Sequence, residues 1–191
     1  MQELSDLQKY VILEKGTEPP FKNKYDKFFD AGIYVCAQCY NPLFYSATKF
    51  NSSCGWPAFD TAMKDSLKET PDTYNRTCVD CMNCKGHVGH VFFGERFTKA
   101  NRRYCANSAS MQFIPDNEYL YGYFREEVSK DTDLSKVVVK TPQNFTFIRL
   151  KPSISLEEAI KTFNPEEMVC YNDTQLALAR KFNIKVLVLD E

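Results

Sequence analysis

Two cysteine pairs with identical spacing are the residues of this sequence best suited to metal chemistry. They are Cys36-x-x-Cys39 and Cys81-x-x-Cys84. Each pair places two thiolates on one tight turn, and two such turns can close a tetrahedron of sulfur ligands around zinc. We therefore predict one structural Zn²⁺ per chain. Cys78 and Cys81 form a competing CxxC frame, and no motif includes Cys170.

Three further segments contain side chains suited to redox chemistry. They are Cys54 to Phe59, His87 to Phe92, and Arg103 to Ser110. An arginine stands two residues before Cys105, and a nearby cation lowers the pKa of a thiol and favours the nucleophilic thiolate. The chain has two histidines, His87 and His90, which beside a cysteine could bind polar substrate atoms or move protons. The single tryptophan, Trp56, lies in a Gly-Trp-Pro turn and could form a wall for a methyl or thioether group.

In their order, these motifs resemble those of the methionine-R-sulfoxide reductase B family. The matching segments are Glu14 to Phe21, Tyr34 to Cys39, Lys49 to Pro57, His87 to Phe92, and Arg103 to Ser110. The resemblance implies a peptide-methionine (R)-S-oxide reductase, which reduces the R epimer of methionine sulfoxide in proteins or as the free amino acid. The fold that it implies has two antiparallel β-sheets with short N-terminal helices.

The resemblance also implies a role for individual residues. Cys105 matches the nucleophile, which becomes a sulfenic acid, and Cys54 matches the resolving cysteine, which forms a disulfide with it. Thioredoxin is the expected reductant of that disulfide. The residues that match the substrate pocket are Trp56, His87, His90, Arg103 and Asn107. Those that match the zinc ligands are Cys36, Cys39, Cys81 and Cys84. The pair Cys81 and Cys84 is preferred to the pair Cys78 and Cys81 because the gap between Cys84 and His87 fits the family.

The sequence departs from the family pattern at two places near these motifs. The family often has a carboxylate and a glycine after the His90 motif, whereas this chain has Phe93-Gly94 and its nearest acid is Glu95. An acid that orients a histidine is therefore expected to be missing or displaced. Ala106 replaces the bulkier aliphatic residue that usually follows the nucleophile.

Composition and charge narrow the classes of partner. The chain has 191 residues and a formal net charge of −1, so it lacks the excess of basic residues that a nucleic-acid binder needs. Its first residues show no basic and apolar leader, and no apolar run approaches the roughly 20 residues that span a bilayer. We therefore expect a cytoplasmic monomer that binds neither nucleic acid nor membrane.

Hydrophobic patterning predicts a mainly β (α+β) fold with two domains. Residues 1–115 form the predicted reductase domain, with short strands, a helix over 5–15 that Ser5 and Gln8 cap and Gly16 ends, and a helix over 58–68. Residues 116–191 form a small α/β appendage of unknown function. Its predicted elements are strands at 137–139, 145–148 and 184–189, and helices at 155–163 and about 173–182.

Two other functional classes fit the sequence less well. A non-catalytic zinc-binding interaction module would have the metal site without a nucleophile and a resolving thiol, and for residues 116–191 an interaction role is the favoured hypothesis. A thioredoxin-like oxidoreductase is disfavoured because its redox CxxC opens a helix in a βαβ unit, and neither pair here does so.

Overall fold

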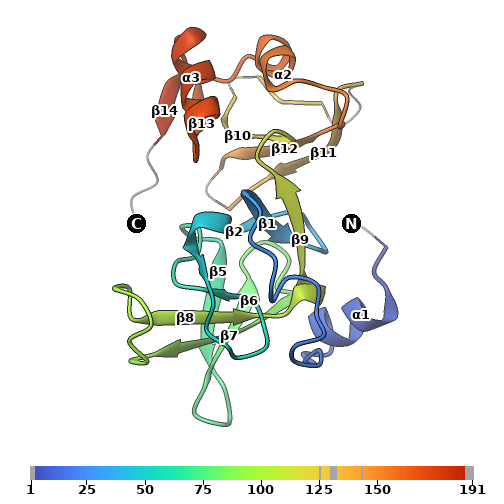
Figure 1. Cartoon of the computed structure of the whole chain (residues 1–191). Coiled ribbons are helices and arrows are strands. Elements are labelled where there is room, and N and C mark those ends of the chain that lie inside the picture. Colours follow the sequence, from blue (N-terminus) through green and yellow to red (C-terminus); the bar gives the residue numbers. More distant parts are fainter. Residues whose placement is uncertain (1–2, 125, 130–132, 143, 188–191) are drawn as a thin grey trace. The chain divides into compact units, whose positions relative to one another are not determined.

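The computed structural model describes residues 3–124, 126–129, 133–142 and 144–187, which belong to two compact units (Figure 1). Unit 1 is Met1–Phe113 and unit 2 is Ile114–Glu191. Strands dominate both units, so the mainly β prediction is confirmed. Within these described ranges, every helix is too short or too polar to cross a bilayer.

Unit 1 begins with one short helix, α1 (Asp6–Ile12). The Ser5 hydroxyl accepts a hydrogen bond from the Gln8 amide, and the Gln8 side chain accepts one from the Ser5 amide, so the predicted capping box is present. The helix ends earlier than predicted. Lys15, and not Gly16, takes the left-handed backbone conformation that follows it, with φ 57°.

Two sheets make up the rest of unit 1. The three-stranded sheet has the order β2-β1-β9, with β1 at Gly32–Cys36, β2 at Pro42–Tyr45 and β9 at Met111–Pro115. The six-stranded sheet has the order β3-β4-β8-β7-β6-β5. Its strands are β3 (Lys49–Phe50), β4 (Ala58–Phe59), β5 (Leu67–Pro71), β6 (Thr77–Cys81), β7 (His87–Phe93) and β8 (Arg102–Ala106). Each neighbouring pair in the six-stranded sheet is antiparallel.

The helix predicted over residues 58–68 is wrong. Ala58 and Phe59 form β4 and pair with Cys105 and Tyr104 of β8. Leu67 already belongs to β5. Pairing with a neighbouring strand satisfies the backbone of this segment, and such tertiary pairing overrides a weak local preference for helix. The correction matters because β4 follows the Cys54 segment and holds it beside β8.

One face of the six-stranded sheet forms the hydrophobic core of unit 1. Buried side chains on this face include Phe59, Val79, Val91 and Tyr104, which pack with Tyr34 and Phe44 of the three-stranded sheet. The rings of Phe44 and Phe59 stack with centroids 4.2 Å apart. Neighbouring residues of a strand point to opposite faces, so the strand neighbours of these buried residues point to the other, polar face. Cys78, His90 and Cys105 are three of them.

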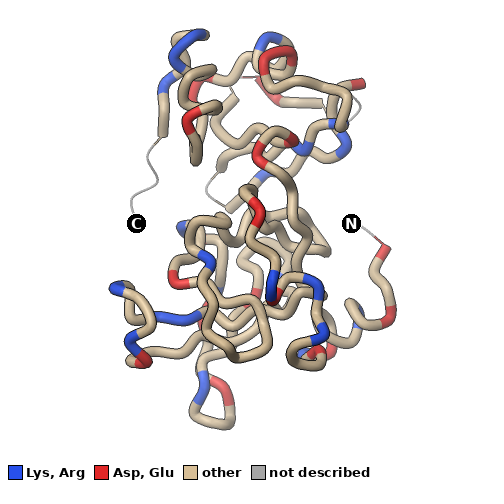
Figure 2. Tube along the Cα trace, in the orientation of Figure 1, with Lys and Arg blue, Asp and Glu red and all other residues tan. Residues whose placement is uncertain are grey.

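Unit 2 contains a five-stranded sheet with the order β11-β12-β10-β13-β14. Its elements are β10 (Tyr119–Tyr123), β11 (Ser135–Lys140), β12 (Thr146–Leu150), α2 (Leu156–Phe163), β13 (Glu167–Val169), α3 (Asp173–Lys181) and β14 (Lys185–Leu187). The predicted strands and helices of this region are confirmed, except that 188–189 lie outside the described residues. β10 and β13 were not predicted. Figure 2 shows basic and acidic residues interspersed along both units.

Candidate active site

A β-bulge places both histidines on the polar face of the six-stranded sheet. Residues three apart on a regular strand point to opposite faces. The pairing of β6 with β7 shifts by one residue, so that Cys78 lies opposite His90 while Asp80 lies opposite His87. Since Cys78 and Asp80 share a face, the bulge brings both imidazoles to that face, with ring centroids 5.4 Å apart. His90 also lies opposite Cys105 of β8.

The close approach of β7 and β8 requires glycine beside the histidines. Gly89 lies opposite Ala106, and a Cβ atom at Gly89 would be 2.0 Å from the Cys105 carbonyl oxygen. A side chain at this position would therefore push the strand that carries Cys105 away from β7.

The structure brings Cys54 and Cys105 together. Cys54 follows β3 in the chain, Cys105 lies on β8, and their sulfur atoms are 3.8 Å apart. The Pro57 carbonyl accepts a hydrogen bond of 3.0 Å from the Ala106 amide, which fixes the loop that carries Cys54 against β8. Both thiols are partly exposed, so a substrate can reach them.

The hydrogen bond between these two thiols couples their titration. A hydrogen bond from Cys105 lowers the pKa of Cys54 to about 5, against the opposing effect of burial, and the same bond raises the pKa of Cys105. The Ser52 hydroxyl donates a further hydrogen bond of 3.0 Å to the Cys54 sulfur. The positive charge of Arg103 favours a thiolate on either cysteine. The pair therefore holds one thiolate and one thiol near neutral pH.

Glu95 holds Arg103 beside the cysteines. The guanidinium donates two hydrogen bonds to the Glu95 carboxylate, at 2.7 and 2.9 Å, and lies over the Phe92 ring at 4.4 Å. Such a bidentate pair fixes the guanidinium plane. The displaced acid noted in the sequence is thus the partner of the arginine and not of a histidine.

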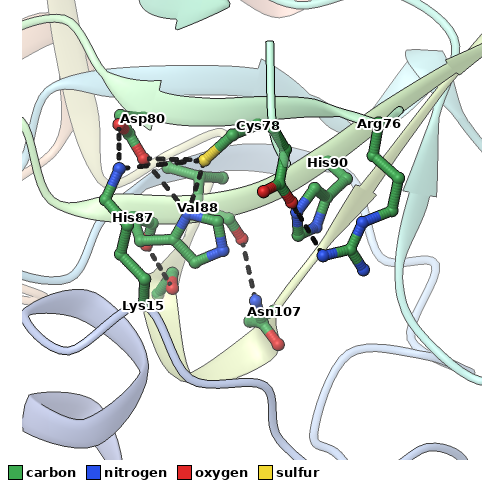
Figure 3. Close-up of polar contacts among 10 residues, drawn as sticks. Lys15, Arg76, Cys78, Asp80, His87, Val88, His90 and Asn107 are labelled. Carbon is green, nitrogen blue, oxygen red and sulfur yellow. Dashed lines mark hydrogen bonds and ion pairs between the residues drawn. The ribbon is translucent and has the colours of Figure 1, made fainter. Parts of the chain in front are cut away.

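Each histidine has its own carboxylate and each carboxylate has its own cation (Figure 3). His87 Nδ1 lies 3.1 Å from Asp80, which Lys15 approaches to 2.8 Å. His90 Nε2 lies 3.1 Å from Asp72, and Arg76 binds the same carboxylate at 2.7 Å.

These contacts set the charge of the two imidazoles. Burial lowers the pKa of His87 and of His90, and each carboxylate opposes that effect. Both rings are therefore mainly neutral near pH 7. Because the carboxylates bind His87 Nδ1 and His90 Nε2, the opposite nitrogen of each ring carries a proton only in the imidazolium form.

Buried Glu18 connects the tryptophan to the asparagine of the predicted pocket. Its carbonyl accepts a hydrogen bond of 3.0 Å from the Trp56 indole, and its amide donates one of 3.2 Å to the Asn107 side chain. Its carboxylate accepts from the amides of Ser108 and Ala109. Asn107 also donates to a β7 carbonyl, that of Val88.

Four cysteines form a separate sulfur cluster. The ligand atoms of Cys36, Cys39, Cys81 and Cys84 all lie within 4.8 Å of one another. The distance between sulfur atoms is 3.6 Å for Cys36 and Cys84 and 3.7 Å for Cys39 and Cys81. A tetrahedral ion with metal–sulfur bonds of about 2.3 Å would separate its ligands by about 3.8 Å, so the cluster fits such an ion. Cys78 lies outside it.

The two CxxC turns have the same backbone geometry. The first cysteine of each turn accepts a hydrogen bond from the residue after the second cysteine, Tyr40 or Lys85, at 2.8 and 2.9 Å. Both of these residues are left-handed, with φ 60° and 65°. Two identical turns from different sheets thus present their thiols to one point.

Sequence reasoning missed the partners that orient the predicted site residues. They are Asp72, Asp80, Lys15, Arg76 and Glu18. Asp80 lies on β6, Asp72 and Arg76 lie in the turn between β5 and β6, and Lys15 and Glu18 lie in the segment after α1. Their spacing along the chain gives no sign that they reach the site. The only sequence signal for two of them is that Lys15 and Glu18 lie in the segment Glu14 to Phe21, which matches the family.

Comparison with known proteins adds an independent observation. The SelR domain family matches residues 4–115. Peptide methionine sulfoxide reductase B2, chloroplastic, of Arabidopsis thaliana is 47% identical over 119 residues, which are 61% of this chain and 59% of that protein. Peptide methionine sulfoxide reductase B3, chloroplastic, of Oryza sativa subsp. japonica is 48% identical over 60% of this chain and 51% of its own length. The chain thus spans only between half and three fifths of these two relatives. Peptide methionine sulfoxide reductase B5 of Arabidopsis thaliana is 46% identical, with 82% of its length covered.

The charges around His90 predict opposite shifts in two variants. Asp72 raises the pKa of His90 and Arg76 lowers it. Asp72→Asn should therefore lower this pKa further, and Arg76→Gln should raise it. With two histidines in the chain, proton NMR can follow each ring through a pH titration, and His87→Gln assigns the signals. Shifts in the same direction, or none in either variant, would contradict this electrostatic account.

Proposed function

Because this chain belongs to the SelR domain family, we propose that it reduces the R epimer of methionine sulfoxide to methionine. The observation that carries the proposal is the pair formed by Cys54 and Cys105, 3.8 Å apart. Beside the pair lies Arg103, and opposite Cys105 lies His90. A nucleophile, a second thiol, a cation and a proton donor are what this reduction needs.

In the first step, Cys105 attacks the sulfur of the sulfoxide. Its proton passes to the thiolate of Cys54. The minor imidazolium form of His87 or His90 donates a proton to the sulfoxide oxygen, which makes the sulfur electrophilic and supplies the proton of the sulfenic acid. Methionine leaves, and the oxygen remains on Cys105 as a sulfenic acid. Cys105 is oxidised by two electrons and the sulfoxide is reduced by two. Trp56 forms the wall for the methyl group, and Glu18 holds its indole in place.

In the second step, the Cys54 thiol condenses with the sulfenic acid and releases one water. The product is a Cys54–Cys105 disulfide, which thioredoxin or another dithiol reduces by exchange. The two sulfur atoms, 3.8 Å apart, must approach to a bond of about 2 Å, which one side-chain rotation of Cys54 in its loop can achieve.

We also propose that the four-cysteine cluster holds one structural zinc ion. Four thiolates leave no open position on zinc, so the ion would supply stability and take no part in the reaction. Residues 1–115 then carry the chemistry as a monomeric domain, and residues 116–191 are a separate appendage. A cytoplasmic location is part of the proposal, although two relatives are named chloroplastic. No observation favours the alternative of a non-catalytic zinc-binding module.

A stereospecific assay tests the proposal. With dithiothreitol as reductant, the protein should convert the R epimer of methionine sulfoxide and leave the S epimer. Cys105→Ser should lower turnover by roughly 10³-fold or more, as loss of a nucleophile does in other enzymes. Cys170→Ser, in unit 2, is the control and should retain activity. Equal turnover of both epimers, or an active Cys105→Ser variant, would refute the proposed function.

A single-turnover experiment distinguishes the two cysteines. Cys54→Ser should release one equivalent of methionine, more slowly because it lacks the thiolate that takes the proton, and then stall with a sulfenic acid on Cys105. Mass spectrometry of the oxidised native chain should find the Cys54–Cys105 disulfide. If Cys105→Ser releases methionine and Cys54→Ser does not, the two roles must be exchanged. A disulfide to Cys78 or Cys170 would assign the resolving role to that residue.

A further inference from the structure

A second group of metal-ligating side chains lies on the polar face of the six-stranded sheet. Cys78 of β6 and His87 and His90 of β7 each offer one ligand atom, and these atoms lie within 4.8 Å of one another. Figure 3 shows Cys78 and both imidazoles gathered along β6 and β7. None of the three belongs to the four-cysteine cluster. The proposed reduction uses the histidines and leaves Cys78 without a role.

The distance between Cys78 and His87 suits two ligands of a tetrahedral transition-metal ion. The Cys78 sulfur lies 3.3 Å from His87 Nδ1. An ion about 2.3 Å from sulfur and about 2.0 Å from nitrogen would separate those two ligands by about 3.5 Å. An Asp80 carboxylate oxygen lies 3.5 Å from the same sulfur and 3.1 Å from the same nitrogen. Asp80 can therefore bind the ion as a further ligand, or it can hold the His87 ring in place while the other ring nitrogen binds the ion.

The His87 ring has ligand capacity that the protein does not use. Its side chain is 1% exposed, and its Nε2 atom has no hydrogen-bond partner among the residues that the structure describes. Leaving a buried polar atom without a partner costs about 1–3 kcal/mol. A ligand that binds Nε2 directly would recover that cost.

The donor set selects the class of ion. One thiolate and two imidazoles suit Zn²⁺, Co²⁺ or Cu²⁺, whereas Mg²⁺ and Ca²⁺ prefer oxygen ligands. Lys15 is the cation that competes for this place, since its ammonium lies 2.8 Å from Asp80 and 3.9 Å from the Cys78 sulfur. Its side chain is 55% exposed and can turn away into solvent. The ion must therefore bind more weakly and more reversibly here than among four thiolates.

We propose that Cys78, His87 and His90 form a second, reversible site for a transition-metal cation of the zinc type. Binding releases the thiol proton of Cys78 to solvent and occupies both imidazoles. If the proposed function is correct, the same ion inhibits the reductase, because the imidazoles that should bind the sulfoxide oxygen are then metal ligands. The binding claim stands without that function, and only the inhibition depends on it.

Cobalt titration of the intact protein, with its tightly held zinc in place, tests the binding claim. Co²⁺ should bind as a second ion by native mass spectrometry and give a sulfur-to-cobalt charge-transfer absorption. Cys78→Ala should weaken binding by at least about tenfold and abolish that absorption. The matched control Cys170→Ala should behave like the native chain, and Mg²⁺ should give neither signal. His90→Gln is a second variant, which should weaken binding and keep the sulfur absorption at high Co²⁺.

Three results would overturn the binding claim. They are the absence of a second ion, a signal that survives Cys78→Ala, and a signal lost in Cys54→Ser, which would place the ion on the catalytic pair. A second experiment measures the reductase rate of each variant with and without added Zn²⁺. Inhibition should be marked in the native chain and in Cys170→Ala and weak in Cys78→Ala. Metal binding without any reductase activity would refute the proposed function and leave the site intact.

Discussion

The convergence of two CxxC turns is the constraint on which the rest of unit 1 depends. One turn joins β1 to β2 and the other joins β6 to β7, so the cluster ties the three-stranded sheet to the six-stranded sheet. Two of the sulfur–sulfur distances, 3.6 and 3.7 Å, match the edge of a tetrahedron of thiolates around a metal ion. A metal held there would contribute its binding free energy to folding. This contribution would compensate for the limited stability of the short strands around it.

The cluster also sets the geometry of the candidate active site. β7 starts three residues after Cys84, and the bulge at its start turns His87 to the same face as His90. That face then carries two groups of polar side chains separated by one strand spacing. Toward β8 lie the cysteine pair and Arg103, and toward β6 lie Cys78 and Asp80. The same imidazoles border both, so a cation on one side and a sulfoxide on the other would compete for them.

Much of this arrangement could be predicted from local patterns. The spacing of the four cysteines, the caps at Ser5 and Ser155 and the apolar runs of the strands each encode a turn, a helix start or a buried face within a few residues. The family motifs predicted that Cys54, Arg103 and the two histidines belong to one site with Cys105. The structure brings Cys54, Arg103 and both histidines to one side of the sheet, although their roles stay predictions.

The remainder depends on strand pairing, which local patterns do not encode. The local sequence around Ala58 favours a helix, and nothing near it in sequence reveals that it pairs with β8. The bulge in β7 and the carboxylates that reach the histidines depend on register between distant strands. Glu18 connects Trp56 to Asn107 across 38 residues on one side and 89 on the other, a relation that only the folded chain reveals.

Metal content and folding of two serine variants test the central role of the four-cysteine cluster most directly. The native chain should carry one tightly held zinc ion through gel filtration. Cys84→Ser should lose that ion and the cooperative unfolding transition of unit 1, since structural zinc contributes on the order of 10 kcal/mol to folding. Cys78→Ser should keep both. If Cys78→Ser loses the ion while Cys84→Ser keeps it and folds, the cluster is not the constraint that organises this structure.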